Sequence, residues 1–139
     1  MLRIQFAQKA VIVDDGRVLM VRKSSEDPYN PHRWELPGGR LEGAEDLDAH
    51  IRREVEEETG LSIEPGELID LWSWDIAVDG EPVRVIAVSR HCYLKERIGV
   101  RPKRAAGDYI DDQMWIPKSE LLSLNLIRSQ VPTLKSIIE

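Results

Sequence analysis

Residues 39–61 read GRLEGAEDLDAHIRREVEEETGL, and this stretch decides most of what the sequence predicts. Apolar side chains recur in it at helical spacing, at Ala44, Leu47, Ile51 and Val55. A glycine at the end of such a pattern is a common C-terminal helix cap. We therefore predict a helix over residues 44–59 that ends at Gly60.

Four glutamates crowd the end of this helix, between positions 54 and 58. Such crowding lowers the stability of a helix unless a cation compensates it. At about 100° per residue, Glu54, Glu57 and Glu58 project within an arc of about 100°, so their carboxylates can converge, whereas Glu56 points to solvent. Three carboxylates suit Mg²⁺ or Mn²⁺, and the helix lacks the thiolates or paired histidines typical of zinc sites. The alternative is an acidic helix face that only contacts water.

The rest of the chain predicts a strand-rich α/β (α+β) fold. Alternating apolar residues indicate strands at residues 4–13, 18–21, 68–78, 83–94 and 114–116. Turn signals at Asp14-Asp15-Gly16 and Asp79-Gly80 indicate two hairpins. We predict loops at residues 24–32 and 97–108, a helix that starts after Pro117 and a short helix over residues 131–138. Hairpin connections favour a mixed or antiparallel sheet, and no linker divides residues 1–139, so we expect one domain.

Composition excludes several classes of protein. With 139 residues, 42% of them hydrophobic, the chain can bury a core, and its net charge of −6 disfavours nucleic acid as a partner. No apolar run approaches the roughly 18 residues of a membrane span. The lone cysteine, Cys92, fits a reducing compartment, and we predict a buried packing thiol rather than a nucleophile. These observations predict a cytoplasmic protein.

The pattern of residues 39–61 resembles the Nudix box. That motif requires a glycine, a glutamate, Arg-Glu, an aliphatic residue, Glu-Glu, a glycine and an aliphatic residue at fixed spacing. Here the positions are filled by Gly39, Glu45, Arg53, Glu54, Val55, Glu57, Glu58, Gly60 and Leu61, and Trp34-Glu-Leu-Pro-Gly-Gly precedes them. The resemblance implies a mixed sheet sandwiched between helices, with the box as a loop–helix–loop.

The resemblance also implies metal-dependent hydrolysis of a diphosphate bond in a nucleoside diphosphate derivative. By position, Glu54, Glu57, Glu58 and the Gly38 carbonyl would be the ligands of Mg²⁺ or Mn²⁺. The metal would offset the charge of the diphosphate and activate the attacking water. Arg53 is a candidate catalytic residue, although a structural pairing with Glu45 is favoured. Gly39, Glu45 and Gly60 would brace the loops around the helix.

Other residues are candidates for the general base or for substrate binding. The base would be Glu54 or Glu57, or else Asp111 or Asp112 just before the strand at residues 114–116. The two aspartates are alternatively outer metal ligands, and Asp112 is also a candidate substrate-binding residue. Arg22 can bind phosphate through its guanidinium. Trp34 and two further tryptophans, Trp72 and Trp74, can stack on a base, although at least one of the latter pair is expected in the core. The basic loop over residues 97–108, with Arg97, Arg101, Lys103 and Arg104, either reaches phosphate or contacts only solvent.

The substrate is predicted by exclusion. Nudix enzymes for ADP-ribose often carry a proline about fifteen residues after the box, and residues 75–77 contain none. The tyrosine common in dinucleoside polyphosphate enzymes is also absent slightly further on. We therefore expect a nucleoside triphosphate, modified or not, with nucleotide sugars and ADP-ribose as alternatives. A non-catalytic nucleotide sensor is a further alternative, and it is disfavoured because such domains usually lose a box glutamate. A homodimer is compatible with the sequence.

Overall fold

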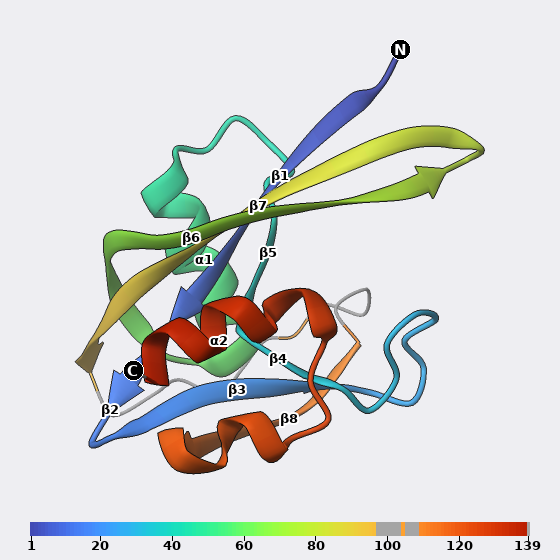
Figure 1. The fold of residues 1–139 in the computed structure, drawn as a ribbon. Helices are drawn as coiled ribbons and strands as arrows, with labels where there is room; N and C mark the ends of the chain where they lie inside the picture. Colours follow the sequence, from blue (N-terminus) through green and yellow to red (C-terminus); the bar gives the residue numbers. More distant parts are fainter. Residues whose placement is uncertain (97–103, 105–108, 139) are drawn as a thin grey trace.

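The structure is a computed structural model that describes residues 1–96, 104 and 109–138. Two sheets form its centre. The first has the strand order β5-β1-β7-β6, from β5 (Gly38–Arg40), β1 (Arg3–Val11), β7 (Glu81–Glu96) and β6 (Ser62–Val78). In the second, β3 (Arg17–Lys23) pairs with β2 (Val13–Asp14), β4 (Trp34–Glu35) and β8 (Ile110–Pro117). Figure 1 shows how the long β6–β7 hairpin extends beyond the body of the protein.

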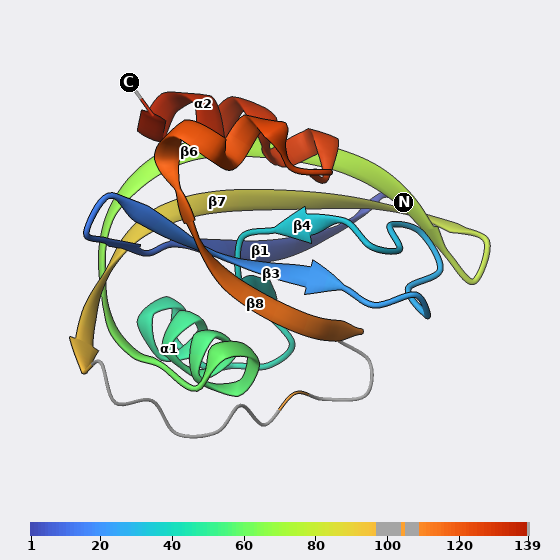
Figure 2. The same cartoon turned by 90° about the horizontal axis from the view of Figure 1, so that it is seen from below.

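Helices cover the sheets from two sides. Figure 2 shows α1 (Leu47–Thr59) on one side and α2 (Val131–Ile138) on the other, with β1, β3 and β7 between them. A 3₁₀ helix, η2 (Lys118–Ser123), follows β8, and η3 (Arg128–Gln130) leads into α2. The predicted mixed sheet between helices is therefore confirmed. Within the described residues, no helix is both long enough and apolar enough to cross a membrane.

The predicted turns are present at both Asp-Gly positions. Asp15 and Gly16 have φ angles of 52° and 72°, and Asp79 and Gly80 have φ angles of 52° and 79°. Such positive angles match the twist of tight hairpins, which is why Asp-Gly is favoured there. The hairpin at Asp15 joins β2 to β3, whereas β1 runs parallel to β7 in the other sheet. The strand predicted over residues 4–13 thus divides between two sheets.

Several predicted boundaries were wrong. Helix α1 begins at Leu47 rather than at residue 44, because the Asp46 side chain caps it by accepting a hydrogen bond from the Ala49 amide at 2.8 Å. Leu47 is also 46% exposed, so it is not part of the buried stripe. Strand β6 starts at Ser62 rather than at residue 68, since its pairing with β7 continues across irregular steps between Pro65 and Asp70.

Strand β8 is longer than predicted. It covers Ile110–Pro117 rather than residues 114–116, so Asp111 and Asp112 lie within a strand and not in a loop before it. The helix predicted after Pro117 is a 3₁₀ helix, while α2 has the predicted bounds. Of the basic loop, Arg104 is described, and Arg97, Arg101 and Lys103 lie outside the described residues.

Cys92 lies in the core, as predicted. It is 2% exposed and packs in a cluster that contains Ile51 and Val55 of α1. Burial raises the pKa of its thiol to about 12. We therefore expect iodoacetamide at pH 8 to modify the folded protein about a thousandfold more slowly than the urea-unfolded chain, because the thiolate is the reactive form. Mass spectrometry of timed samples measures both rates, and equal rates would show that the thiol is accessible.

Candidate active site

The box residues form a loop, helix α1 and a second loop. Gly60, the C-cap of α1, has a φ of 76°, in the left-handed region that favours glycine. Its amide donates to the Glu56 carbonyl at 2.8 Å. At the other end, Gly38 and Gly39 in β5 pair with β1. The glycines expected to brace the motif thus lie where the backbone must turn or approach another chain segment closely.

Close packing explains both glycines of β5. Gly38 has a φ of +136°, and a Cβ added there would lie 2.0 Å from the Gln8 carbonyl oxygen. A Cβ added to Gly39 would lie 2.9 Å from Glu54 Oε2. A side chain at Gly39 would therefore occupy the space that the Glu54 carboxylate uses. The glycine thus lets this carboxylate lie directly against β5.

Arg53 connects three glutamates of the motif. Its guanidinium lies 2.6 Å from Glu45, 3.1 Å from Glu57 and 3.4 Å from Glu54. Hydrogen bonds from Arg53 lower the pKa of Glu45, and those to Glu45 and Glu57 raise the pKa of Arg53. The contact with Glu45 has the geometry expected for the predicted brace. Arg53 also contacts two predicted metal ligands. Its catalytic role stays a prediction.

The three predicted carboxylate ligands lie on one side of α1 and differ in their exposure and partners. Glu58 is 3% exposed, and its Oε1 accepts a hydrogen bond from the Gly38 amide at 3.1 Å. Glu54 is 8% exposed, and Glu57 has a side chain that is 36% exposed and bonded to Arg53. Among residues 1–96, 104 and 109–138, no three acidic, histidine or cysteine side chains are gathered closely enough to hold a metal ion.

The predicted convergence of the three carboxylates is therefore not reached in this arrangement, in which Arg53 contacts Glu54 and Glu57 while Glu58 accepts from the Gly38 amide. The donor set still has the chemistry that Mg²⁺ and Mn²⁺ prefer, namely carboxylate and carbonyl oxygens. The Gly38 amide contacts Glu58, so the residue whose carbonyl is a proposed ligand lies beside a second proposed ligand.

A buried lysine beside these ligands was missed by the sequence reasoning. Lys9 in β1 is 9% exposed, and its Nζ lies 2.5 Å from Glu35 Oε1 and 3.2 Å from the Gly38 carbonyl oxygen. Burial alone would lower the pKa of Lys9, but the negative charges of Glu35 and Glu58 outweigh it and raise the pKa. The amine is therefore charged. An apolar strand with one lysine gave no signal that this charge lies at the site.

His50 also supports the motif, although no role was assigned to it from sequence. It is fully buried, with Nδ1 3.0 Å from Gln8 Nε2 and Nε2 3.1 Å from the Arg40 carbonyl oxygen. Burial lowers the pKa of His50, so the ring is neutral at pH 7 and donates from Nε2 while accepting at Nδ1. The histidine thereby ties α1 to β1 and to β5.

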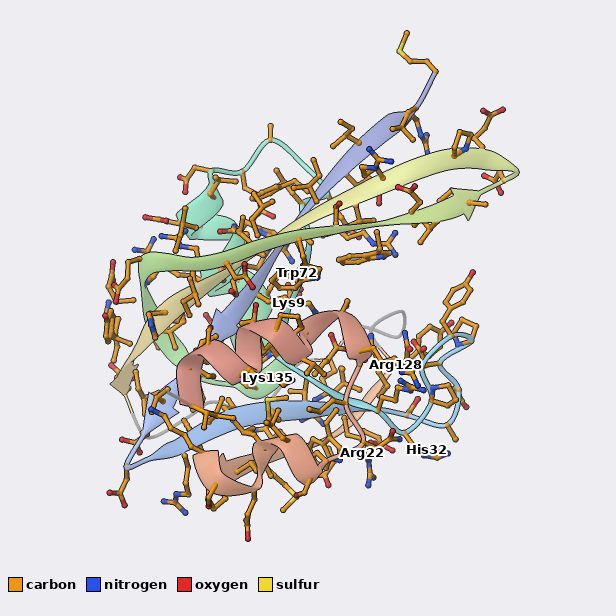
Figure 3. The ribbon with its side chains drawn as sticks, viewed as in Figure 1. Lys9, Arg22, His32, Trp72, Arg128 and Lys135 are labelled. Carbon is orange, nitrogen blue, oxygen red and sulfur yellow. The ribbon has the colours of Figure 1, made fainter. Side chains whose placement is uncertain are left out.

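The predicted substrate-binding residues lie on the second sheet, in β3, β4 and β8. Figure 3 shows Arg22 and His32 near the end of β3, whereas Lys9 lies near the centre of the molecule. Arg22 Nε is 2.9 Å from Asp111 Oδ1, and its guanidinium lies over the Trp34 ring, 5.7 Å from the centroid. Trp34 is 9% exposed and belongs to the core. Asp112 is half-buried, opposite Arg22.

Two further tryptophans named as stacking candidates lie on the first sheet. Trp72 and Trp74 of β6 are partly buried and pack against Ala7, Val85 and Ala87. At least one of them was expected to contribute to the core, and both do so with partly buried rings. Substrate stacking by either ring stays a prediction, as do the substrate contacts of Arg22, Trp34 and Asp112.

A mixed sheet between helices and a glutamate-rich loop–helix–loop together define a Nudix-type hydrolase. A family model for the NUDIX domain matches residues 5–137. Phosphatase NudJ of Escherichia coli is 31% identical over 120 residues, which cover 86% of this chain and 72% of that protein. A MutT-like protein of Streptomyces ambofaciens is 40% identical over 62 residues, which cover 45% of this chain but only 37% of that protein.

The structural comparison agrees. The crystal structure of a MutT NUDIX hydrolase from Burkholderia pseudomallei superposes with a TM-score of 0.73 at 24% identity, over 97% of this chain and 98% of that one. The chain belongs to the NUDIX family. The predicted enzyme class, a Nudix pyrophosphohydrolase, is thereby confirmed.

Proposed function

We propose that this chain hydrolyses a diphosphate bond in a nucleoside triphosphate, modified or not, with Mg²⁺ or Mn²⁺ held by Glu54, Glu57, Glu58 and the Gly38 carbonyl. The observation that carries the proposal is the hydrogen bond from the Gly38 amide to Glu58 Oε1 at 3.1 Å, because it holds the glycine whose carbonyl is a proposed ligand against a glutamate of the helix. When bound, a divalent ion would offset the charge of the diphosphate and increase the acidity of water.

The side chains around this site have separate tasks in the proposed reaction. Arg53 holds Glu57 and Glu45 and so keeps the loop against α1. Glu57 is the favoured general base, because its carboxylate is half-exposed and can accept a proton from a water at the site. Glu54 is the alternative base, but it is 8% exposed and packed against Gly39.

The second region of the proposed substrate site lies near Arg22. An open cavity of about 470 Å³ is lined by Ser24, Glu26, Arg104, Tyr109 and Asp111, among others. Arg104 also donates to the Glu58 carbonyl at 2.9 Å, which links the cavity to the end of α1. We propose that phosphate oxygens are bound there by Arg104, which lines the cavity, and by Arg22, which pairs with the lining residue Asp111. Asp111 is a less favoured base, because it is paired with Arg22.

The named relatives and the cysteine content bear on the substrate class and the cellular setting. The relative named phosphatase NudJ supports a phosphate-containing substrate, and nucleotide sugars and ADP-ribose are the alternatives to a nucleoside triphosphate. A nucleotide sensor is disfavoured because all the box glutamates are present. The single buried cysteine supports a cytoplasmic location. Association of two copies stays a prediction from sequence.

A substrate panel tests the proposal. The purified protein is incubated with nucleoside triphosphates, nucleotide sugars and ADP-ribose, and products are separated by chromatography. We expect cleavage of a nucleoside triphosphate into a monophosphate and pyrophosphate. Preferential cleavage of a nucleotide sugar or ADP-ribose would replace the substrate but keep the chemistry. Nucleotide binding without any cleavage, by folded protein in Mg²⁺, would instead support a sensor.

A further inference from the structure

The peptide Glu35-Leu36-Pro37-Gly38, which we call the ligand-bearing turn, carries the carbonyl proposed as a metal ligand. Its polar groups are bonded to several other elements. The Leu36 amide donates to Gln130 Oε1 at 2.7 Å, and the Pro37 carbonyl accepts from the Ala10 amide at 2.8 Å. The position of the Gly38 carbonyl therefore depends on contacts made by distant parts of the chain.

Lys9 contacts both ends of the ligand-bearing turn. Its Nζ donates to the Glu35 carboxylate at one end and to the Gly38 carbonyl at the other. Glu35 is in turn 3.2 Å from Lys23 Nζ, so its carboxylate lies between two amines. Lys9 is itself almost fully buried in the middle of β1, where neighbouring strands limit its movement.

We propose that Lys9 is a positioning residue for the divalent-cation site. Its hydrogen bond fixes the direction of the Gly38 carbonyl oxygen. A carbonyl oxygen has two lone pairs, so the bond from Lys9 leaves one for a metal ion. Partners that orient metal ligands typically change metal affinity by 10–100-fold when removed. This inference rests on the proposed function, because it requires Gly38 to be a ligand.

Electrostatics alone predicts the opposite effect for Lys9. An ammonium group close to a bound cation repels it, so removal of that charge would strengthen metal binding if the turn kept its shape. Positioning predicts weaker binding after the same removal. The sign of the change in metal affinity therefore separates the two roles.

The experiment measures Mn²⁺ binding by isothermal titration calorimetry, well below the melting temperature of each variant. We expect Lys9→Met, which keeps the length and apolar part of the side chain, to weaken Mn²⁺ binding about tenfold. Lys9→Arg should restore most of that loss, since it keeps the charge and the donors. The control is Arg90→Met, which removes a partly buried cation of the same sheet. Arg90 bonds to Asp48, Gln8 and the Gly66 carbonyl and not to the turn. It should leave Mn²⁺ affinity unchanged.

A second variant guards against loss of folding. The double substitution Lys9→Met with Glu35→Gln neutralises both members of the pair, so the carboxylate of Glu35 is not left buried without Lys9. It should show the same tenfold weakening. Unchanged or tighter Mn²⁺ binding by either variant would overturn the inference. If Glu57→Gln weakens binding while the Lys9 variants do not, only the role of Lys9 fails. If Glu57→Gln also leaves binding unchanged, the proposed metal site itself fails.

Discussion

Glu57→Gln is expected to reduce turnover of the best nucleotide substrate by at least about a hundredfold in Mg²⁺, because it removes a metal ligand and the favoured general base together. The fold should persist. Glu57 has a side chain that is 36% exposed, and the new amide oxygen can still accept from Arg53. Steady-state kinetics and circular dichroism of the same sample measure the two effects separately.

Glu56→Gln is the matched control for this prediction. Glu56 is exposed on the same helix, one residue away. Its substitution by glutamine removes the same charge from the chain. It should keep nearly full turnover. Equal losses in the two variants would mean that net charge matters rather than the position of Glu57. Full activity of Glu57→Gln would remove Glu57 from the site.

Glu35→Gln is expected to destabilise the fold by about 3–5 kcal/mol, because it leaves a buried amine without its ionic partner. Glu35 is 3% exposed, and its carboxylate contacts Lys9 and Lys23. Urea unfolding followed by fluorescence measures the loss. Asp75→Asn breaks the ion pair with Arg84, whose side chains are 62% and 45% exposed, and should change the free energy of unfolding little. Comparable losses in both variants would show that burial of the Glu35 pair is unimportant.

The loss of folding stability caused by Glu35→Gln should become smaller as the pH falls. Burial by itself would raise the pKa of Glu35, but Lys9 and Lys23 outweigh burial and lower it below the value of 4.5 for a free side chain. The charged carboxylate therefore contributes its full stability above that value, and the contribution is lost as the pH falls through the folded-state pKa. The difference between parent and variant should narrow in acid. A constant difference from neutral pH to pH 3 would contradict the assignment.

Local signals in the sequence predicted the elements that are defined locally. The Asp-Gly turns, the cap at Gly60 and the spacing of Glu54, Glu57 and Glu58 all depend on neighbouring residues. The start of α1 was misplaced because capping by Asp46 competes with continuation of the apolar stripe to residue 44. The parallel pairing of β1 with β7 has no local signal, since it joins residues far apart in the chain.

The parts of the site that sequence could not predict are long-range contacts. Lys9 meets Glu35 across 26 positions, and Gln130 meets Leu36 across 94. The sequence assigned no role to His50, because its partners, Gln8 and the Arg40 carbonyl, come close only when α1 packs on β1 and β5. The motif therefore identified the proposed ligands, whereas the residues that hold them in place required the fold.

Removal and return of the divalent ion tests the central claim most directly. The protein is treated with EDTA, dialysed and assayed with its best nucleotide substrate while Mg²⁺ is titrated back. We predict that turnover is lost on removal and returns along a saturable curve as Mg²⁺ is added. Undiminished turnover in the metal-depleted protein, verified by elemental analysis, would contradict metal-dependent diphosphate hydrolysis at the box glutamates.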